Sequence, residues 1–290
     1  MAQKTVKLSV VNIALSQPHN HERYFQLWQT AFRAKRPIKV HGHTCAMIGT
    51  IDLDETKSYI FGHLFKFTEI EVDGAWLDLI TGKKADDNIV SEQVSIPDRL
   101  RPNLQEFPYV FDLDTHRLVF INKLDSRANL YPYMVKKMLE RLFMSVPVFG
   151  QPDITIEPEH ESLQKIFSMP RLKKLEITIT PPNALDDTER RILGLLDNRN
   201  LSRYEEIQTS KDSRGVIVDE DTKAKANVAK SNGLVKATGK DENGKTVNYS
   251  TEDHPFEDIK RYNPKVSSAL LLIKSSFQDI LRKILKHDKT

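Results

Sequence analysis

The sequence predicts an α+β fold, in which a mainly antiparallel sheet with flanking helices is followed by a C-terminal module of helix, hairpin and long helix. Short apolar runs with alternating spacing, divided by polar turns, predict the strands. Segments with apolar residues on one helical face interrupt these runs and predict the helices. Hydrophobic residues make up 39% of the 290 residues and no tract is of low complexity, so the chain can build a sizeable core.

The first part of the chain predicts a strand, a helix and an antiparallel meander. Apolar residues alternate from Val6, and a change of phase at Val11 is typical of a β-bulge. Residues 21–34 carry aromatic side chains at helical spacing with basic residues between them, and Pro37 ends this helix. The β-rich runs that follow span residues 38–51, 58–67 and 75–80, with a short strand or connector at 89–94.

A hairpin, a helix and a strand–helix–strand unit are predicted next. The apolar runs 109–111 and 118–121 flank a polar tip, which indicates a β-hairpin. Pro132 suits the first turn of a helix because no intrahelical N–H bond is needed there, and an apolar stripe follows it. Short elements are then predicted at 154–156 (strand), 161–169 (helix) and 175–179 (strand).

Two consecutive prolines, Pro181 and Pro182, predict a domain boundary because they end the preceding strand. We therefore expect an N-terminal α+β domain at 1–182 and a C-terminal module at 183–290. The module is predicted to contain a helix at 186–197, a polar loop at 209–232 and a hairpin around Asn243-Gly244, since this dipeptide favours a type I′ turn.

The last helix, predicted to start at Asn263-Pro264, has apolar residues in a heptad pattern. The seam consists of Val266, Leu270, Ile273, Phe277, Ile280 and Ile284. Further leucines widen the apolar face beyond a two-stranded seam. The pattern has two interpretations: packing on the helix's own domain, or a homodimer contact, and the module is predicted to carry the dimer contact.

Composition narrows the class of protein. The single cysteine, Cys45, excludes a disulfide framework within one chain and suits a reducing, cytoplasmic compartment. No apolar run approaches the length needed to span a bilayer, so we expect no direct membrane insertion. Common nucleotide-binding and hydrolase motifs are absent, and no cofactor is expected. With 43 basic against 40 acidic residues, a nucleic-acid partner requires a local basic patch.

Three such patches occur, at the end of the first helix, across the polar loop and hairpin, and at the end of the last helix. The candidate nucleic-acid-binding residues are Arg33, Lys35, Arg36, Lys39, Lys223, Lys225, Lys230, Lys236, Lys240, Arg282, Lys283 and Lys286. Each patch can contact phosphates or simply form a solvated face.

Clusters of metal-capable residues give a rival interpretation. Asp112, Asp114 and His116 alternate at the hairpin tip and, with Glu157, could hold Mg²⁺ or Mn²⁺ in a nuclease, although Asp is also an ordinary turn former. His41 and His43 precede Cys45, but they form no closed zinc ligand set. Cys45 as a nucleophile is disfavoured by its apolar neighbours. No metal site is therefore assigned.

Several runs together resemble a family of uncharacterised bacterial proteins associated with phage defence. They are Arg101-Pro102-Asn103, residues 109–120, residues 174–179 leading to Pro182-Asn183, and residues 250–255. Through residues 154–158, the following short helix and strand, and the Lys-rich tail helix, the chain is more distantly similar to the RexA family of phage-exclusion DNA-binding sensors. The first hundred or so residues depart strongly from that family's pattern.

The resemblance implies a cytoplasmic homodimer that binds DNA with little sequence preference. It also implies that the protein relays a phage signal, in abortive infection or exclusion, to a second defence protein, often a membrane protein. No catalytic residue carries over. The alternatives are the metal-dependent nuclease effector and an adaptor that assembles with another protein through its heptad face without binding nucleic acid.

Overall fold

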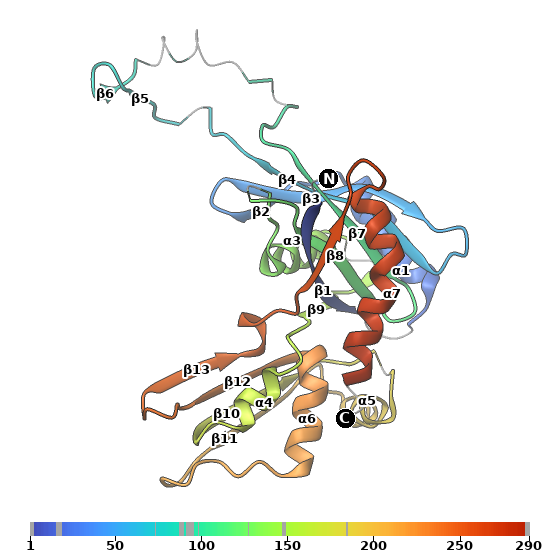
Figure 1. Cartoon of the computed structure of the whole chain (residues 1–290), viewed down its shortest axis with the longest axis vertical. Coiled ribbons are helices and arrows are strands. Elements are labelled where there is room, and N and C mark those ends of the chain that lie inside the picture. The colour runs from blue at the N-terminus through green and yellow to red at the C-terminus, as the bar shows by residue number, and fades with distance from the viewer. Residues whose placement is uncertain are drawn as a thin grey trace.

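The computed structural model describes residues 3–15, 19–72, 74–86, 90, 96–97, 99–126, 128–146, 149–183 and 185–287. Over these residues the chain forms the predicted α+β fold, with two main antiparallel sheets, helices packed against them and a separate two-stranded sheet (Figure 1). The strands are β1 (Lys4–Ala14), β2 (Ile38–His41), β3 (Thr44–Leu53), β4 (Tyr59–Thr68), β5 (Leu77–Asp78), β6 (Lys83–Lys84), β7 (Gln105–Asp112), β8 (Arg117–Lys123), β9 (Asp153–Ile156), β10 (Arg171–Ile179), β11 (Tyr204–Thr209), β12 (Gly233–Lys240), β13 (Thr246–Ser250) and β14 (Asp258–Tyr262). The helices are α1 (His21–Arg33), α3 (Pro132–Met144), α4 (Ser162–Phe167), α5 (Asp187–Asn198), α6 (Glu220–Ser231) and α7 (Ala269–His287), with a 3-10 turn, η2 (Thr251–Asp253).

The large sheet has the order β14-β1-β8-β7-β4-β3-β2, with β9 also paired to β1, and it curls into a half-barrel. Both of its faces are covered. In β8, Leu118 and Phe120 join the core under α1 and α3, whereas Val119 and Ile121 join the core under α7. A strand buried on both sides needs apolar residues at every position, which explains its unbroken Leu-Val-Phe-Ile run.

The same two-sided burial explains the change of apolar phase in β1. Val6 and Val10 face the core under α7, whereas Val11 and Ile13 face the core under α1 and α3. These positions keep a strict alternation, so the predicted slip at Val11 is not a bulge. A register shift does occur in the pairing of β1 with β8, but it lies between Lys7 and Leu8.

The smaller sheet has the order β11-β10-β12-β13, and α4, α5 and α6 supply its helical partners (Figure 1). Helix α6 lies within residues 209–232, where we predicted a polar loop. Asp219 caps this helix, because its carboxylate accepts from the backbone N–H of Thr222 at 2.8 Å. Its buried face consists of small residues such as Ala226 and Ala229, which pack closely on the sheet but give little hydrophobic signal in the sequence.

The two sheets do not divide the chain at a single point. Strand β10, from before residue 182, pairs with β11 and β12 from after it. Strand β14, which sequence reasoning missed, returns to pair with β1, and α7 packs on the same large sheet. The predicted ranges 1–182 and 183–290 therefore each contribute to both sheets.

Helix α7 begins at Ala269 rather than at Asn263, whose side chain instead accepts from the backbone N–H of Lys265. Four seam residues, Ile273, Phe277, Ile280 and Ile284, are buried against the chain's own sheet. Val266 lies before the helix with 81% of its surface exposed, and Leu270 is partly buried. The heptad spacing thus serves an intramolecular contact, which makes these four side chains inaccessible to a second copy in this fold. A homodimer stays a prediction and would require another surface.

A buried polar network joins the two sheets. Arg117 and Glu157, both 1% exposed, form an ion pair in which Nε donates to Oε1 at 2.9 Å. The second carboxylate oxygen of Glu157 accepts from the Ser231 hydroxyl at 2.8 Å. The Asn12 amide donates to the Ser231 carbonyl oxygen at 2.7 Å and to Asn232 Oδ1 at 3.0 Å. The network therefore ties the end of α6 to β1, β8 and the residue after β9.

The β5–β6 hairpin projects from the body of the molecule (Figure 1). The predicted run 75–80 contributes only the two residues of β5, and Ile80 at the tip is 97% exposed. Except for residue 90, the predicted element at 89–94 lies outside the described residues. Among the helices that the structure describes, none is both long enough and apolar enough to cross a membrane.

Candidate nucleic-acid interface

The first predicted basic patch lies where α1 and α3 end beside β2. Helix α1 ends at Arg33, and Lys35 adopts a left-handed conformation with φ 43°, which turns the chain. Pro37 then prevents the helix from continuing. In β2 the strand alternation buries Ile38 and exposes Lys39. This turn brings the basic residues after α1 to the C-terminal end of α3.

These elements surround a hollow of about 420 Å³, which we call the basic hollow. It is lined by Arg36, Pro37, Ile38, Lys39, Arg141, Met144 and Ser145. The lining carries three permanent cations and no carboxylate. Arg33 and Lys35 are exposed and close in sequence, and they extend the positive surface beyond the hollow. The cations also suit the negative C-terminal ends of the two helices, which partly explains why they lie there.

Helix α3 supplies two cations that the sequence prediction did not include. Arg141 Nη1 donates to the carbonyl oxygen of Lys39 at 3.1 Å, and Lys137 Nζ donates to that of Val40 at 2.7 Å. Each uses one donor in this contact and retains others for a ligand. Their i, i+4 spacing places both on one face of a helix, and that spacing is the signal that could have identified them.

Few carboxylates neutralise this surface. Lys39 Nζ lies 3.8 Å from Glu71 Oε1, and both side chains are more than half exposed, so the pair is weak. For Arg33, Lys35 and Arg36, no ion pair is present within the part of the chain that the structure describes. The positive charge of the basic hollow is therefore available to an anion.

The second and third predicted patches differ, because acidic side chains of the same chain occupy their cations. Lys223 pairs with Glu220 at 2.7 Å and Lys225 with Glu206 at 2.8 Å. The pKa of Lys225 is raised, chiefly by its contacts with Asp221 and Glu206. These ion pairs neutralise the two ammonium groups, which are therefore less available to a phosphate.

The other members of those patches are also occupied or buried. Arg282 pairs with Asp279 at 3.2 Å and Lys283 with Asp258 at 2.9 Å. Lys240 Nζ donates to the Gly244 carbonyl oxygen, and only 7% of Lys230 is exposed. The side chain of Lys286 lies outside the described residues. The structure therefore distinguishes the first patch from the other two.

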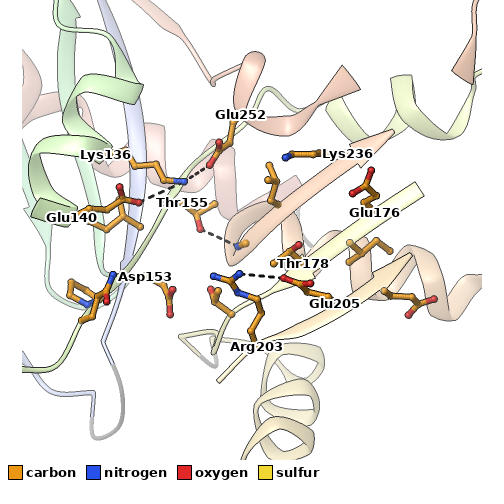
Figure 2. Close-up of a pocket in the computed structure, with 18 of the residues that line it drawn as sticks. Lys136, Glu140, Asp153, Thr155, Glu176, Thr178, Arg203, Glu205, Lys236 and Glu252 are labelled. Atoms are coloured by element: carbon orange, nitrogen blue, oxygen red, sulfur yellow. Dashed lines mark hydrogen bonds and ion pairs between the residues drawn. The ribbon is translucent and has the colours of Figure 1, made fainter. Parts of the chain in front are cut away.

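Lys236 lies in a separate cleft of about 480 Å³ between the two sheets (Figure 2). Its walls come from α3 and β9 on one side and from β10, β11 and β12 on the other. Acidic residues outnumber basic ones in the lining: Glu140, Asp153, Glu176, Glu205, Glu206 and Glu252 face Lys136, Arg203 and Lys236.

Two of the three cations of this cleft are already engaged, whereas Lys236 forms no ion pair with another described residue. Lys136 pairs with Glu252 and lies 3.9 Å from Glu140, and Arg203 lies 3.3 Å from Glu205 (Figure 2). Burial raises the pKa of Glu140 and of Asp153. An excess of negative charge repels phosphate, so the cleft does not extend the candidate nucleic-acid interface.

The residues predicted for a metal-dependent nuclease do not converge. Asp112 accepts from the backbone N–H and the hydroxyl of Thr115, at 2.9 and 2.7 Å, which is a turn contact. Asp114 accepts from His21 Nε2 at 2.8 Å. Glu157 belongs to the buried ion pair with Arg117. These contacts support the interpretation of the hairpin tip as an ordinary polar turn rather than as a metal site.

His116 is buried, and its ring lies against aromatic side chains. Its ring stacks on Tyr24 at 4.0 Å and on His19 at 5.3 Å between centroids. Burial, followed by the neighbouring His19, lowers the pKa of His116 to about 4. Across the described residues, no group of at least three His, Cys, Asp or Glu side chains is placed to hold a metal ion.

The His41, His43 and Cys45 run also lacks a reactive arrangement. His41 and His43 are exposed, whereas Cys45 is 1% exposed and its thiol donates to Glu69 Oε2 at 3.6 Å. Burial and the neighbouring Glu69 carboxylate raise the pKa of this thiol, which disfavours the nucleophilic thiolate.

Fold and surface together define the class of protein: an α+β protein with two main sheets and a basic hollow whose cations are not neutralised by strong ion pairs within the described chain. Residues 4–283 match the family model described as a domain of unknown function, DUF4747, and the chain belongs to this family. Among curated proteins, none matches the chain.

Proposed function

We propose that this protein binds DNA non-specifically by contacting phosphates with the basic hollow and the adjoining Arg33 and Lys35. The observation that carries the proposal is the unequal neutralisation of the three basic patches. A cation already paired with a carboxylate gains little free energy by contacting a phosphate. An unpaired cation that contacts a phosphate releases a counterion from DNA, which favours binding. Phosphate contacts of this kind carry no base information, so little sequence preference is expected.

The cellular role we propose is a sensor or regulatory component of an antiphage system that acts by abortive infection or exclusion. Its support is the resemblance of the runs at 101–103, 109–120, 174–183 and 250–255 to a phage-defence-associated family, and the more distant likeness to RexA. In this role, DNA binding would be relayed to a second defence protein, which can be membrane-bound.

The test is a salt series of fluorescence-anisotropy titrations with labelled duplex DNA. The triple variant Arg33→Gln/Lys35→Gln/Arg36→Gln removes three cations of the open surface. If each contacts one phosphate, the slope of log K against log salt should become shallower by about 2.7.

A matched control removes three paired cations, Lys223→Gln/Lys225→Gln/Arg282→Gln, and so changes the net charge equally. Its slope should stay close to that of the wild type. Equal loss in both triple variants would show a diffuse charge effect and contradict the assignment to this surface. Absence of binding by the wild type at low salt would end the DNA-binding proposal and favour the protein adaptor.

A further inference from the structure

Two exposed tyrosines stand at the N-terminal end of the helix whose C-terminal end lines the basic hollow. Tyr131 and Tyr133 are each 48% exposed, and their rings are nearly parallel, with an interplanar angle of 11° and centroids 6.0 Å apart. Neither phenol donates or accepts a hydrogen bond with another described residue. About half of the surface of each tyrosine is therefore left in solvent.

The tyrosines are not needed to start the helix. Tyr131 occupies the N-cap position but makes no side-chain capping bond, and Pro132 begins the helix with its fixed backbone angle. The buried stripe of α3, which includes Val135 and Met138, holds the helix on the large sheet. The stability of α3 therefore does not explain the aromatic pair.

Helical geometry aligns the pair with the cations of the interface. Tyr133, Lys137 and Arg141 are spaced by four residues, so they follow one face of α3. With a rise of ~1.5 Å per residue, Tyr133 and Arg141 are separated by about 12 Å along the axis. That length matches about three to four stacked nucleotides at ~3.4 Å each.

The neighbouring face of α3 has a different use. Lys136 and Glu140 turn into the inter-sheet cleft, where Lys136 pairs with Glu252 and Glu140 (Figure 2). The excess of acids in that cleft keeps a nucleic-acid backbone on the side of Lys137 and Arg141. Aromatic rings at one end of a cationic track are the arrangement that single-strand-binding proteins use.

We propose, resting on the DNA-binding function above, that Tyr131 and Tyr133 form a stacking platform for unpaired bases. The phosphates of that single-stranded segment follow Lys137 and Arg141 into the basic hollow. Bases in an intact duplex are stacked on each other and unavailable to the rings. The protein accordingly recognises single-stranded DNA more strongly than duplex DNA, without a sequence code.

The test compares an oligothymidylate with a duplex of equal length for the full-length wild type and for Tyr131→Ala/Tyr133→Ala. Stacking of one base contributes between about five- and 150-fold to affinity. The single-strand affinity of the double variant should therefore fall by at least about fivefold. Its duplex affinity should stay within about twofold of the wild type. Because stacking releases few counterions, the salt slope should be unchanged.

The conservative variant Tyr131→Phe/Tyr133→Phe keeps both rings and should retain single-strand affinity, whereas a role of the hydroxyls predicts its loss. Equal single-strand affinity of the wild type and the alanine variant would overturn the stacking platform. If the arginine and lysine triple variant still loses binding in that case, the proposed DNA-binding function stands alone. Loss of both duplex and single-strand binding in the alanine variant, with a shallower salt slope, would also overturn the platform, because the rings would then act through the charged surface.

Discussion

Removal of Arg117 is expected to be among the most destabilising single changes in this chain. Its guanidinium Nε donates to Glu157 Oε1 at 2.9 Å, and Nη1 donates to the Thr115 carbonyl oxygen at 3.1 Å. Arg117→Met would leave the Glu157 carboxylate buried with the Ser231 hydroxyl as a remaining donor. Leaving one charge of a buried pair without its partner costs about 3–5 kcal/mol of the free energy of unfolding.

The assay is equilibrium urea denaturation followed by circular dichroism. Arg282→Met is the matched control, because it removes an arginine from an exposed pair with Asp279 and should cost less than about 1 kcal/mol. The double variant Arg117→Met/Glu157→Leu removes both buried charges and should cost less than the sum of its single variants. The assignment of a buried ion pair that joins the sheets would be refuted by either of two results. One is a change in the free energy of unfolding of the double variant equal to the sum of the single changes. The other is a loss for Arg117→Met no greater than that for Arg282→Met.

Two further predictions concern pH and backbone strain. The pKa of His116 is about 4 in the folded chain and 6.5 in the unfolded chain. Its contribution to the free energy of unfolding is therefore fully present above pH 6.5 and falls by about 3 kcal/mol as the pH decreases toward 4. The urea midpoint of the wild type should therefore fall more between pH 7 and pH 4 than that of His116→Phe, and equal falls would contradict the assignment. Gly233 has φ 149°, and a Cβ there would lie 2.0 Å from the Thr178 carbonyl oxygen, so Gly233→Ala should cost more than about 2 kcal/mol in a thermal melt. Gly194→Ala on α5 meets nothing within 4 Å and should instead stabilise the fold by about 0.5–1 kcal/mol. A Gly233→Ala variant as stable as the wild type would show that the close approach at Gly233 is absent.

Local patterns predicted most elements because their burial is large and periodic. The apolar stripe of α3 and the alternation of β10 are examples, since each faces one core. Helix α6 was missed because most of its buried residues are alanines or polar residues, which give little hydrophobic signal. Strand β14 was missed because only alternate residues of this edge strand are partly buried. The heptad seam of α7 shows a different limitation. Its periodicity predicts that one face of the helix is covered, but it does not predict that the covering surface comes from β-strands far away in the sequence.

The same limit applies to the candidate interface. In the sequence, acidic residues interrupt the second basic patch and one lies beside the third, whereas residues 33–39 of the first contain none. Some of their ion pairs are local, such as Lys223 with Glu220. Others, such as Lys225 with Glu206 and Lys283 with Asp258, join partners that are separated in the chain and meet only in the fold. Conversely, Arg141 joins Arg36 only because α3 ends beside β2. Which cations remain available to a ligand is thus in part a tertiary property, and removing equal numbers of paired and unpaired cations tests it directly.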